Sequence, residues 1–213
     1  MLSGFRNLTL RRMLVMLAGI VLLSIGVALF DFSRTGNDPS TSVVIILGER
    51  TGLGLSRMML LCNSVYFVVE LLLAREMIGP GTFVNWMCIG PVAEVLLAWL
   101  RRVPWLCGGT LALPVRLSIM AAGVLILSLG ASMYQTADTG IAPYDALSII
   151  LSRRQRKIPY FWCRMATDSL CAAATALLGG IVGLGTLICA LGLGPFISFF
   201  DRAVSRRLCG RSA

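Results

Sequence analysis

The chain has 213 residues, of which 57% are hydrophobic and 14% charged, and it carries a formal net charge of +9 without any histidine. This composition lies outside soluble globular usage and within the membrane class, so a single membrane domain is expected over residues 1–213. The basic residues stand in short clusters between apolar runs, which argues against a nucleic-acid partner and favours the positive-inside pattern.

The first apolar run, residues 13–30, follows a basic segment that contains Arg6, Arg11 and Arg12. The run is too long for the apolar core of an ordinary signal sequence, and no small-x-small cleavage site follows it. It is therefore predicted to stay in the protein as the first membrane helix.

Five further runs are long enough to span a bilayer core of about 30 Å at about 1.5 Å per residue. They cover residues 58–74, 82–100, 117–134, 158–178 and 184–200. Two other runs, 41–48 and 146–151, are short, and each follows a Gly-x-x-Pro sequence. They are predicted to be short spans or re-entrant helices. The expected fold class is thus all-α, a polytopic transmembrane helix bundle.

The sequence contains an internal repeat, because residues 12–100 align without a gap on residues 116–204. The matched breakers are Gly36 with Gly140, Pro39 with Pro143, Gly81-Thr82 with Gly185-Thr186, and Gly90-Pro91 with Gly194-Pro195. Apolar composition alone does not match glycines and prolines in one register. Each half is predicted to be one repeat of three long spans and one short or re-entrant helix.

The direction of the repeats depends on whether the short segments cross the membrane. If they cross, the arginine clusters at 50–57 and 101–116 lie on the cytoplasmic side with both termini, and the repeats are parallel. If they do not cross, the repeats are inverted and these clusters move outside. Charge asymmetry favours the parallel arrangement. Residues 101–115 are expected to be an interfacial linker, and residues 205–213 a basic tail that lies against anionic headgroups.

The segment from Gly140 to Asp145 is the main candidate site, because it places two backbone breakers and a carboxylate among apolar residues. Gly140 permits a positive φ and Pro143 suits the first position of a helix, so a helix is expected to begin at Pro143. Its free N–H groups can hold an anion or a carboxylate. The alternative is that Asp145 only caps its own helix. The matched residue in the first repeat is Thr41, so the two breaks are expected to differ.

Arg164 and Asp168, four residues apart, are the expected partners of Asp145 and Tyr144 in a substrate or ion site. Each charge alone at the membrane centre would cost about 2.5–3.5 kcal/mol on insertion scales, and pairing lowers that cost. The alternative is a purely structural pair in which Arg164 reaches the interface. Glu70 and Glu94 are candidates for a buried proton-carrying acid, and Glu94 is preferred because Glu70 stands close to a helix end.

The remaining glycines and prolines are expected to be structural. Gly185 and Thr186 are predicted to form a turn into a helix that the threonine caps. Gly194 and Pro195 are predicted to kink a helix and to pack closely against a neighbour.

No cofactor, metal site or enzymatic activity is predicted. The chain has no histidine, and its seven cysteines lack Cys-x-x-Cys spacing, so they are interpreted as apolar packing residues. No lysine follows the paired Gly-x-Gly-Thr sequences, which argues against a nucleotide-binding loop, and no nucleophile and base are paired.

Three motifs resemble those of the YczE/YyaS family of bacterial integral membrane proteins, relatives of the YitT group. They are Thr139-Gly140-Ile141-Ala142-Pro143-Tyr144-Asp145-Ala146-Leu147, Gly183-Leu184-Gly185-Thr186-Leu187 and Gly194-Pro195-Phe196-Ile197. Members typically carry Gly-x-x-Pro-Trp-Asp-x-Leu, whereas here Tyr144 replaces the tryptophan and the first break lacks the aspartate. The resemblance implies a multi-pass protein of the bacterial inner membrane and adds little about activity.

Transport of an unidentified small molecule or ion is the leading hypothesis, because repeats, broken helices and membrane carboxylates occur together in transporters. Asp145 is expected to bind the substrate or a proton, with Arg164 and Asp168 as its partners and Glu94 as a second acid. The alternative is a regulatory or scaffolding membrane protein, which would use the glycines for packing and the basic loops for partners. The sequence predicts no oligomeric state.

Overall fold

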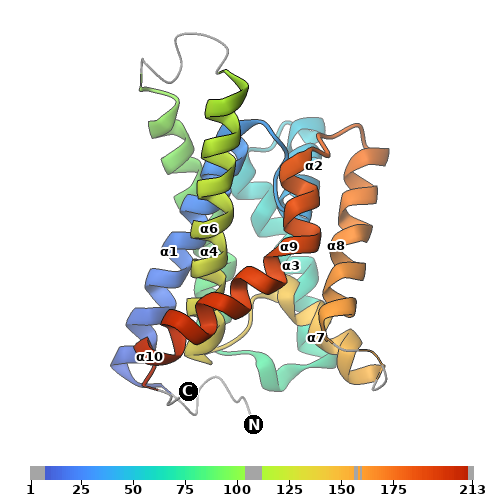
Figure 1. Ribbon diagram of the computed structural model, residues 1–213. Coiled ribbons are helices and arrows are strands. Elements are labelled where there is room, and N and C mark those ends of the chain that lie inside the picture. The colour runs from blue at the N-terminus through green and yellow to red at the C-terminus, as the bar shows by residue number, and fades with distance from the viewer. Residues whose placement is uncertain (1–7, 104–111, 156–157, 159, 211–213) are drawn as a thin grey trace.

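The computed structural model describes residues 8–103, 112–155, 158 and 160–210, and all regular elements in this part of the chain are helices (Figure 1). The long helices are α1 (Leu10–Ser33), α3 (Leu55–Leu73), α4 (Pro80–Leu100), α6 (Leu113–Ala137), α8 (Tyr160–Leu177) and α9 (Leu184–Phe200). The shorter elements are α2 (Pro39–Thr51), η2 (Arg75–Met77), α7 (Pro143–Arg154), η3 (Asp201–Ser205) and α10 (Arg206–Leu208). The all-α prediction is confirmed. Most of the expected linker, residues 104–111, lies outside the described residues.

Within the described residues, five helices are long and apolar enough to cross a membrane: α1, α3, α4, α6 and the continuous helix Leu184–Leu208. The sixth expected span, α8, is not among them, because the charges of Arg164 and Asp168 lower its hydropathy. Large apolar side chains such as Val65 and Leu72 of α3 point outward, at 64% and 66% exposure. Such a surface suits lipid, and the chain is a multi-pass membrane protein.

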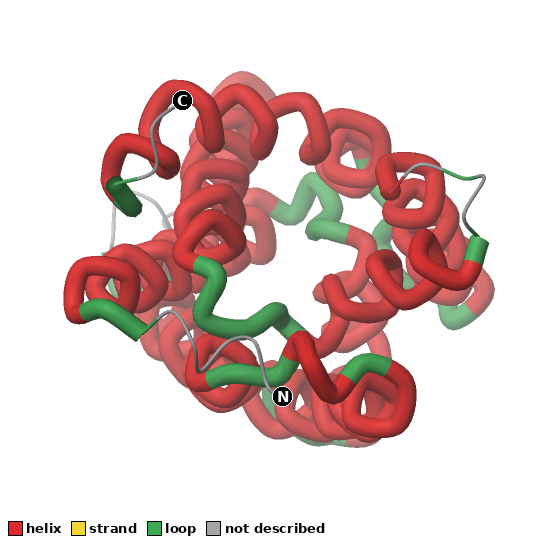
Figure 2. The backbone as a smooth tube through the Cα atoms, turned by 90° about the horizontal axis from the view of Figure 1, so that it is seen from below, coloured by secondary structure: helices red, strands yellow, loops and turns green. Residues whose placement is uncertain are grey.

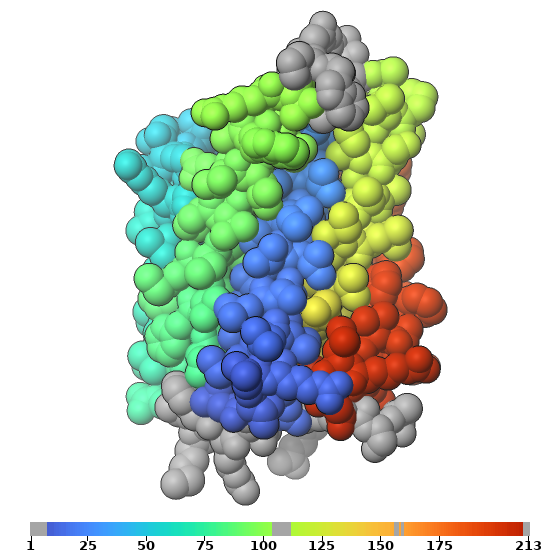
Figure 3. All heavy atoms as spheres, turned by 90° about the vertical axis from the view of Figure 1, so that its left-hand side faces the viewer, coloured from blue at the N-terminus to red at the C-terminus, as the bar shows by residue number. Residues whose placement is uncertain are grey.

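Helices α1 and α6 make the most extensive helix–helix contact among the described elements, and Figure 3 shows α1 lying between α4 and α6. Glycines allow their backbones to approach closely. A Cβ atom on Gly19 would lie 2.9 Å from the carbonyl oxygen of Gly130, and one on Gly26 would lie 2.6 Å from Cβ of Leu127. Any side chain at these positions would push the two helices apart.

Helices α1 and α6 run in opposite directions. Gly19, in the first half of α1, lies against Gly130 in the second half of α6, whereas Phe30 near the end of α1 contacts Gly123. Figure 1 shows α1 rising from the end of the bundle toward which α6 descends. The parallel arrangement expected from charge is therefore wrong. Helices α2 and α7 have 13 and 12 residues, and a helix of that length, roughly 20 Å, is too short for a full crossing.

The start of α1 and α10 lie at the same end of the bundle, where Arg11 Nη2 donates to the carbonyl oxygen of Arg207 at 2.9 Å. We call this the terminal end and the other the opposite end. Seen from the terminal end, the helices stand around the circumference and loop segments run through the interior (Figure 2).

Arginines from the clusters at 50–57 and 101–116 lie at the opposite end, where they have structural partners. Arg50 Nη2 donates to the carbonyl oxygen of Leu178 at 2.7 Å, and Arg116 Nε donates to that of Ser33 at 2.8 Å. Both acceptors are carbonyls at helix C-termini, which lack partners within the helix. Counting these arginines as topology signals explains the error in the predicted direction.

Both Gly-x-x-Pro segments break the helical structure as predicted. Gly36 and Gly140 have φ angles of +97° and +125°, a region open to glycine and strained for other residues. Helices α2 and α7 then begin at Pro39 and Pro143, where the fixed φ of proline suits the first helical position.

Each break is held by the other half of the chain. Gly185 N donates to the carbonyl oxygen of Thr35 at 3.0 Å, and Gly81 N donates to that of Thr139 at 2.9 Å. The sequence alignment pairs the two donors, Gly81 and Gly185, and the two acceptors, Thr35 and Thr139, so the two hydrogen bonds are equivalent. The two breaks are thus anchored in the same way, each at the start of a helix from the other half.

Proline lies inside α4 and α9, at Pro91 and Pro195, as expected. Figure 1 shows α9 changing direction along its length, and an internal proline is a usual cause of such a bend. Gly194 packs against a neighbour as predicted, since a Cβ atom there would lie 3.2 Å from the ring of Phe161.

Candidate functional site

Four of the predicted site residues form one polar cluster between α7 and α8. Asp145 is ion-paired with Arg164, and Arg164 Nε donates to Asp168 Oδ2 at 3.3 Å. Tyr144 Oη donates to Asp168 Oδ1 at 2.5 Å. We call Tyr144, Asp145, Arg164 and Asp168 the Arg164 cluster. The structure thus brings these four predicted residues together.

The cluster follows from local structure. The start of α7 at Pro143 places Asp145 in the first turn of that helix, where the helix dipole favours a negative charge. Arg164 and Asp168 are four residues apart on α8 and therefore share one face. A hydrogen bond of 2.8 Å between the hydroxyls of Ser148 and Thr167 joins the two helices beside the cluster.

Asp145 does not serve as the cap that the alternative interpretation assigned to it. Helix α7 begins after Ala142 without a side-chain capping bond, and Asp145 instead accepts from Arg164 and from Gln135 Nε2, the latter at 3.3 Å. In the first break, by contrast, Asp38 Oδ2 accepts from Thr41 N at 3.1 Å and caps α2. The two breaks thus have different chemistry, as predicted.

The cluster is a shielded set of charges. The side chains of Asp168, Asp145 and Arg164 are 3%, 11% and 23% exposed, and the guanidinium carbon of Arg164 lies 4.9 Å from the ring centre of Tyr144. One guanidinium serves two carboxylates, so the cluster is formally short of one positive charge. Buried charges need such partners, and anything that draws Arg164 away leaves a carboxylate without one.

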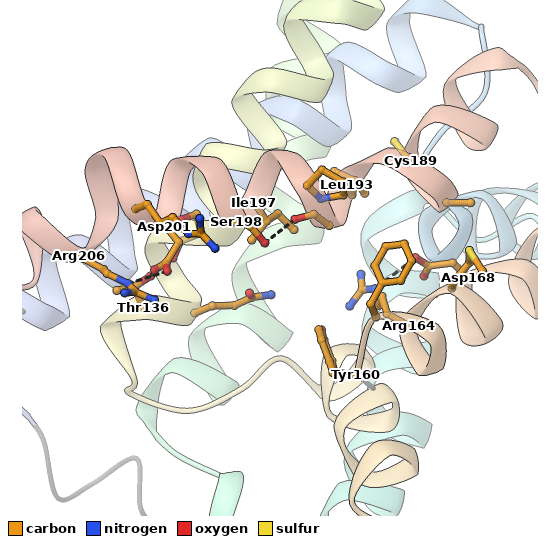
Figure 4. A pocket seen from close by; sticks show the side chains of 18 residues that line it. Thr136, Tyr160, Arg164, Asp168, Cys189, Leu193, Ile197, Ser198, Asp201 and Arg206 are labelled. Atoms are coloured by element: carbon orange, nitrogen blue, oxygen red, sulfur yellow. Dashed lines mark hydrogen bonds and ion pairs between the residues drawn. The ribbon is translucent and has the colours of Figure 1, made fainter. Parts of the chain in front are cut away.

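A cavity of about 840 Å³ adjoins the cluster (Figure 4). Arg164, Asp168 and Cys189 lie toward one side of it, and Asp201 and Arg206 toward the other. Asp201 is paired with Arg206 at 2.8 Å, on the segment that ends at α10. The cavity therefore extends from the terminal end of the bundle to the Arg164 cluster.

A second cavity, of about 350 Å³, lies at the opposite end. Its lining includes Asp31, Arg34, Gly36, Asn37, Ser42, Glu49 and Arg101. Gly36 also contacts Thr186, since a Cβ atom on Gly36 would lie 2.5 Å from Thr186 Oγ1. Cys189, about one turn further along α9, lines the first cavity. A single turn of α9 and the first break thus separate the two cavities.

Glu94, expected as the second acid, is not part of the cluster. It is exposed on α4, and its Oε1 lies beside Gly54 before the start of α3. Glu70 has the opposite environment, with 0% exposure. Position along an apolar run does not reveal which way a side chain points, and this is why the sequence preferred the wrong glutamate as the buried acid.

The predicted threonine cap is present at only one of the two matched helices. Thr82 Oγ1 accepts from Gly79 N at 3.2 Å at the start of α4. Thr186, at the start of α9, is buried and its Oγ1 has no hydrogen-bond partner within the described residues. Because Thr186 contacts Gly36 closely, it is part of the barrier between the two cavities.

Several residues of the site were missed by sequence reasoning. Gln135 on α6 reaches Asp145, and Tyr160 and Phe161 on α8 line the large cavity. Gln135 is a polar residue close before the second break, a signal that could have marked it. Among the described residues, no group of three acidic, cysteine or histidine side chains is arranged to hold a metal ion.

Comparisons with known proteins give a family but no activity. The model of a family of unknown function, DUF6198, matches residues 10–202. An uncharacterised protein of Haemophilus influenzae is 27% identical over 194 residues, which cover 90% of this chain and 84% of that protein. An uncharacterised membrane protein of Bacillus subtilis, YczE, is 21% identical over 183 residues, with coverage of 85% and 81%. No solved structure matches.

Proposed function

Because the chain belongs to the DUF6198 family and is a YczE-like membrane protein of unknown activity, we propose its function from the geometry of the Arg164 cluster: it is a permease for a small polar molecule or ion. The observation that carries the proposal is the pair of cavities that approach one thin barrier from opposite ends. Charged groups at the inner side of a cavity and broken helices beside it are the usual parts of a transporter site.

The two halves act as inverted repeats in this proposal. Support comes from the opposite directions of α1 and α6 and from the paired hydrogen bonds of Gly81 and Gly185, each to the break of the other half. A movement of one half against the other would close one cavity and enlarge the other. Such alternating access is the general mechanism of transporters built from inverted repeats.

The large cavity suits a solute of modest size. Its volume, about 840 Å³, lies within the roughly 300–1,000 Å³ of typical small-molecule sites. Arg164 and Asp168 offer charge and hydrogen bonds, whereas Tyr160 and Phe161 offer aromatic surface. We therefore infer a polar or charged solute that exchanges contacts with the Arg164 cluster.

The terminal end is proposed to face the cytoplasm of a bacterial cell, across its inner membrane. Arg11 and Arg12 at the start of α1, Arg153 and Arg154 at the end of α7, and the arginines of α10 belong to this end. Positive residues concentrate on the cytoplasmic side of membrane proteins, and they would also bind anionic headgroups. The large cavity then opens inward in the conformation described.

Single-cysteine labelling tests whether the cavities are paths into the protein. In a cysteine-free background, Ile197→Cys lines the large cavity and Ile45→Cys lines the smaller one. With a membrane-impermeant maleimide applied to sealed vesicles of known orientation, Ile197→Cys should react from the terminal end and Ile45→Cys from the opposite end. Absence of reaction at both sites in folded protein would favour the scaffolding alternative.

A further inference from the structure

Glu70 on α3 is a buried acid that the Arg164 cluster does not use. Its side chain is 0% exposed, and neither carboxyl oxygen has a hydrogen-bond partner within the described residues. An ionised carboxylate in such a place lacks both water and a counter-charge, and a carboxyl group in this situation takes up a proton. Glu70 therefore has the environment in which a carboxyl group binds a proton.

Glu70 lies on α3, which packs against the helix that bears Tyr144 and Asp145. Tyr66 and Glu70 are four residues apart and share one face of α3, and Ala74 directly follows the end of that helix. The ring of Tyr66 lies 5.7 Å from that of Tyr144 on α7, and Ala74 packs with Ala146 of the same helix. Glu70 lies between these two contacts in the sequence, and its carboxyl group interacts electrostatically with that of Asp145.

The charged groups on the helices around Glu70 are engaged elsewhere. In η2, Arg75 Nε donates to the carbonyl oxygen of Leu71 at 2.8 Å, and Glu76 is paired with Arg153. On α4, Glu94 lies beside Gly54 before the start of α3.

The remaining charged neighbours leave Asp145 as the group that faces Glu70. On α2, Arg50 donates to the carbonyl oxygen of Leu178 at the opposite end, and Glu49 lines the small cavity there. On α7, Arg154 is in the last turn of the helix, whereas Asp145 is in the first. Asp145 is thus the charged group that interacts with Glu70, and Arg164 is already shared by Asp145 and Asp168.

We propose that Glu70 is a proton-binding site that couples the permease to the proton gradient by exchanging its proton with Asp145. This inference rests on the proposed function and names its coupling ion. When a solute draws Arg164 away from Asp145, the O–H bond of Glu70 breaks and an O–H bond forms on Asp145. Glu70 then takes a proton from water at the terminal end, so the protein has gained one proton for each solute bound.

Infrared spectroscopy of the purified protein tests the proton on Glu70 without requiring transport. A neutral carboxyl group shows a carbonyl stretch that an ionised carboxylate lacks. The wild type should show this band at neutral pH, Glu70→Gln should lose it, and Glu94→Gln, the matched change at an exposed glutamate, should keep it. A band that survives in Glu70→Gln, or that is absent from the wild type, would overturn the proposal.

The coupling between Glu70 and Asp145 is tested by titrating the same infrared band with pH. Asp145→Asn removes the negative charge that favours a proton on Glu70, so the band should disappear at a lower pH, with roughly a tenfold weaker proton affinity. An unchanged titration in Asp145→Asn would show that the two acids are not coupled. Normal elution of each variant from a sizing column excludes misfolding as the cause. Failure of the permease assignment leaves these spectra unchanged, so the two ideas fail separately.

Discussion

Asp145 and Arg164 form an ion pair across two helices, 19 residues apart in sequence. The pair joins the first turn of a broken helix to a helix that bears a second acid, Asp168, on the same face. Arg164 is thus the common partner of two carboxylates, and this makes it the residue whose removal has the largest consequence.

Replacement of Arg164 should destabilise the protein more than replacement of either acid. Arg164→Ala leaves two shielded carboxylates without a counter-charge, and breaking a buried pair in this way costs about 3–5 kcal/mol. Asp145→Asn leaves Arg164 paired with Asp168 and should cost less. Thermal unfolding of the purified variants measures which of them is less stable. Equal melting temperatures for Arg164→Ala and Asp145→Asn would contradict the prediction.

Asp145→Asn should abolish transport while the protein remains abundant in the membrane. The amide cannot provide the charge that Arg164 or a solute exchanges, yet it keeps the shape of the side chain. Glu94→Gln, an exposed change outside the cluster, is the matched control and should leave transport intact. Loss of abundance in step with loss of activity would indicate a structural role for Asp145.

Tyr144→Phe isolates one hydrogen bond of the cluster. The change removes the donor to Asp168 but keeps the ring that packs against Tyr66. A hydrogen bond to a charged group contributes about 1.5–3 kcal/mol, and the melting temperature should fall accordingly. Tyr66→Phe removes a hydroxyl that has no hydrogen bond among the described residues and should change stability little. Similar losses in both variants would contradict the assignment.

The two broken segments should tolerate no side chain at their glycines. Gly36→Ala and Gly140→Ala combine a positive φ with contacts that a Cβ atom would make within 2.7 Å. Gly52 also has a positive φ, +72°, but open space around it. Gly52→Ala should therefore lower the free energy of unfolding by only about 1 kcal/mol, through backbone strain. Folded yield in detergent should drop sharply for the first two variants and little for the third. Equal yields would contradict the account.

Close packing of α1 on α6 predicts that alanine is destabilising at a glycine in the contact and harmless at a glycine in open space. Gly26→Ala would place a methyl group 2.6 Å from Cβ of Leu127, whereas the nearest atoms to Gly192 are 3.8 Å away. Overpacking costs about 1–3 kcal/mol, while alanine in an open helical position is favoured by about 0.8–1 kcal/mol over glycine. Thermal unfolding should show a loss for Gly26→Ala and none for Gly192→Ala. The reverse order would contradict this packing.

Local chemistry made much of the site predictable. Gly140 and Pro143 specify a break and a helix start through backbone geometry alone, and the spacing of Arg164 and Asp168 places both on one face of a helix. These features depend on residues close together in sequence. The pairing with Asp145 was predicted because the connection between the two helices is short.

Features that depend on distant parts of the chain were not predictable. The contact of Gly36 with Thr186 joins the two halves, and no local sequence pattern predicts it. The relative direction of α1 and α6 was misjudged because Arg50 and Arg116 have partners at helix ends, which charge counting does not reveal. Glu70 and Glu94 were ranked by their position along a run, whereas the direction in which each side chain points decides which one is buried.

The most direct test of alternating access uses the native Cys189, which lines the large cavity next to the barrier and is 1% exposed. In a variant that keeps Cys189 and replaces the other six cysteines, an impermeant maleimide is applied from each side of sealed, oriented vesicles. The account predicts slow labelling from both sides, with the rates changing in opposite directions when a proton gradient is applied. Labelling from the terminal end alone, with a rate that no gradient changes, would contradict it.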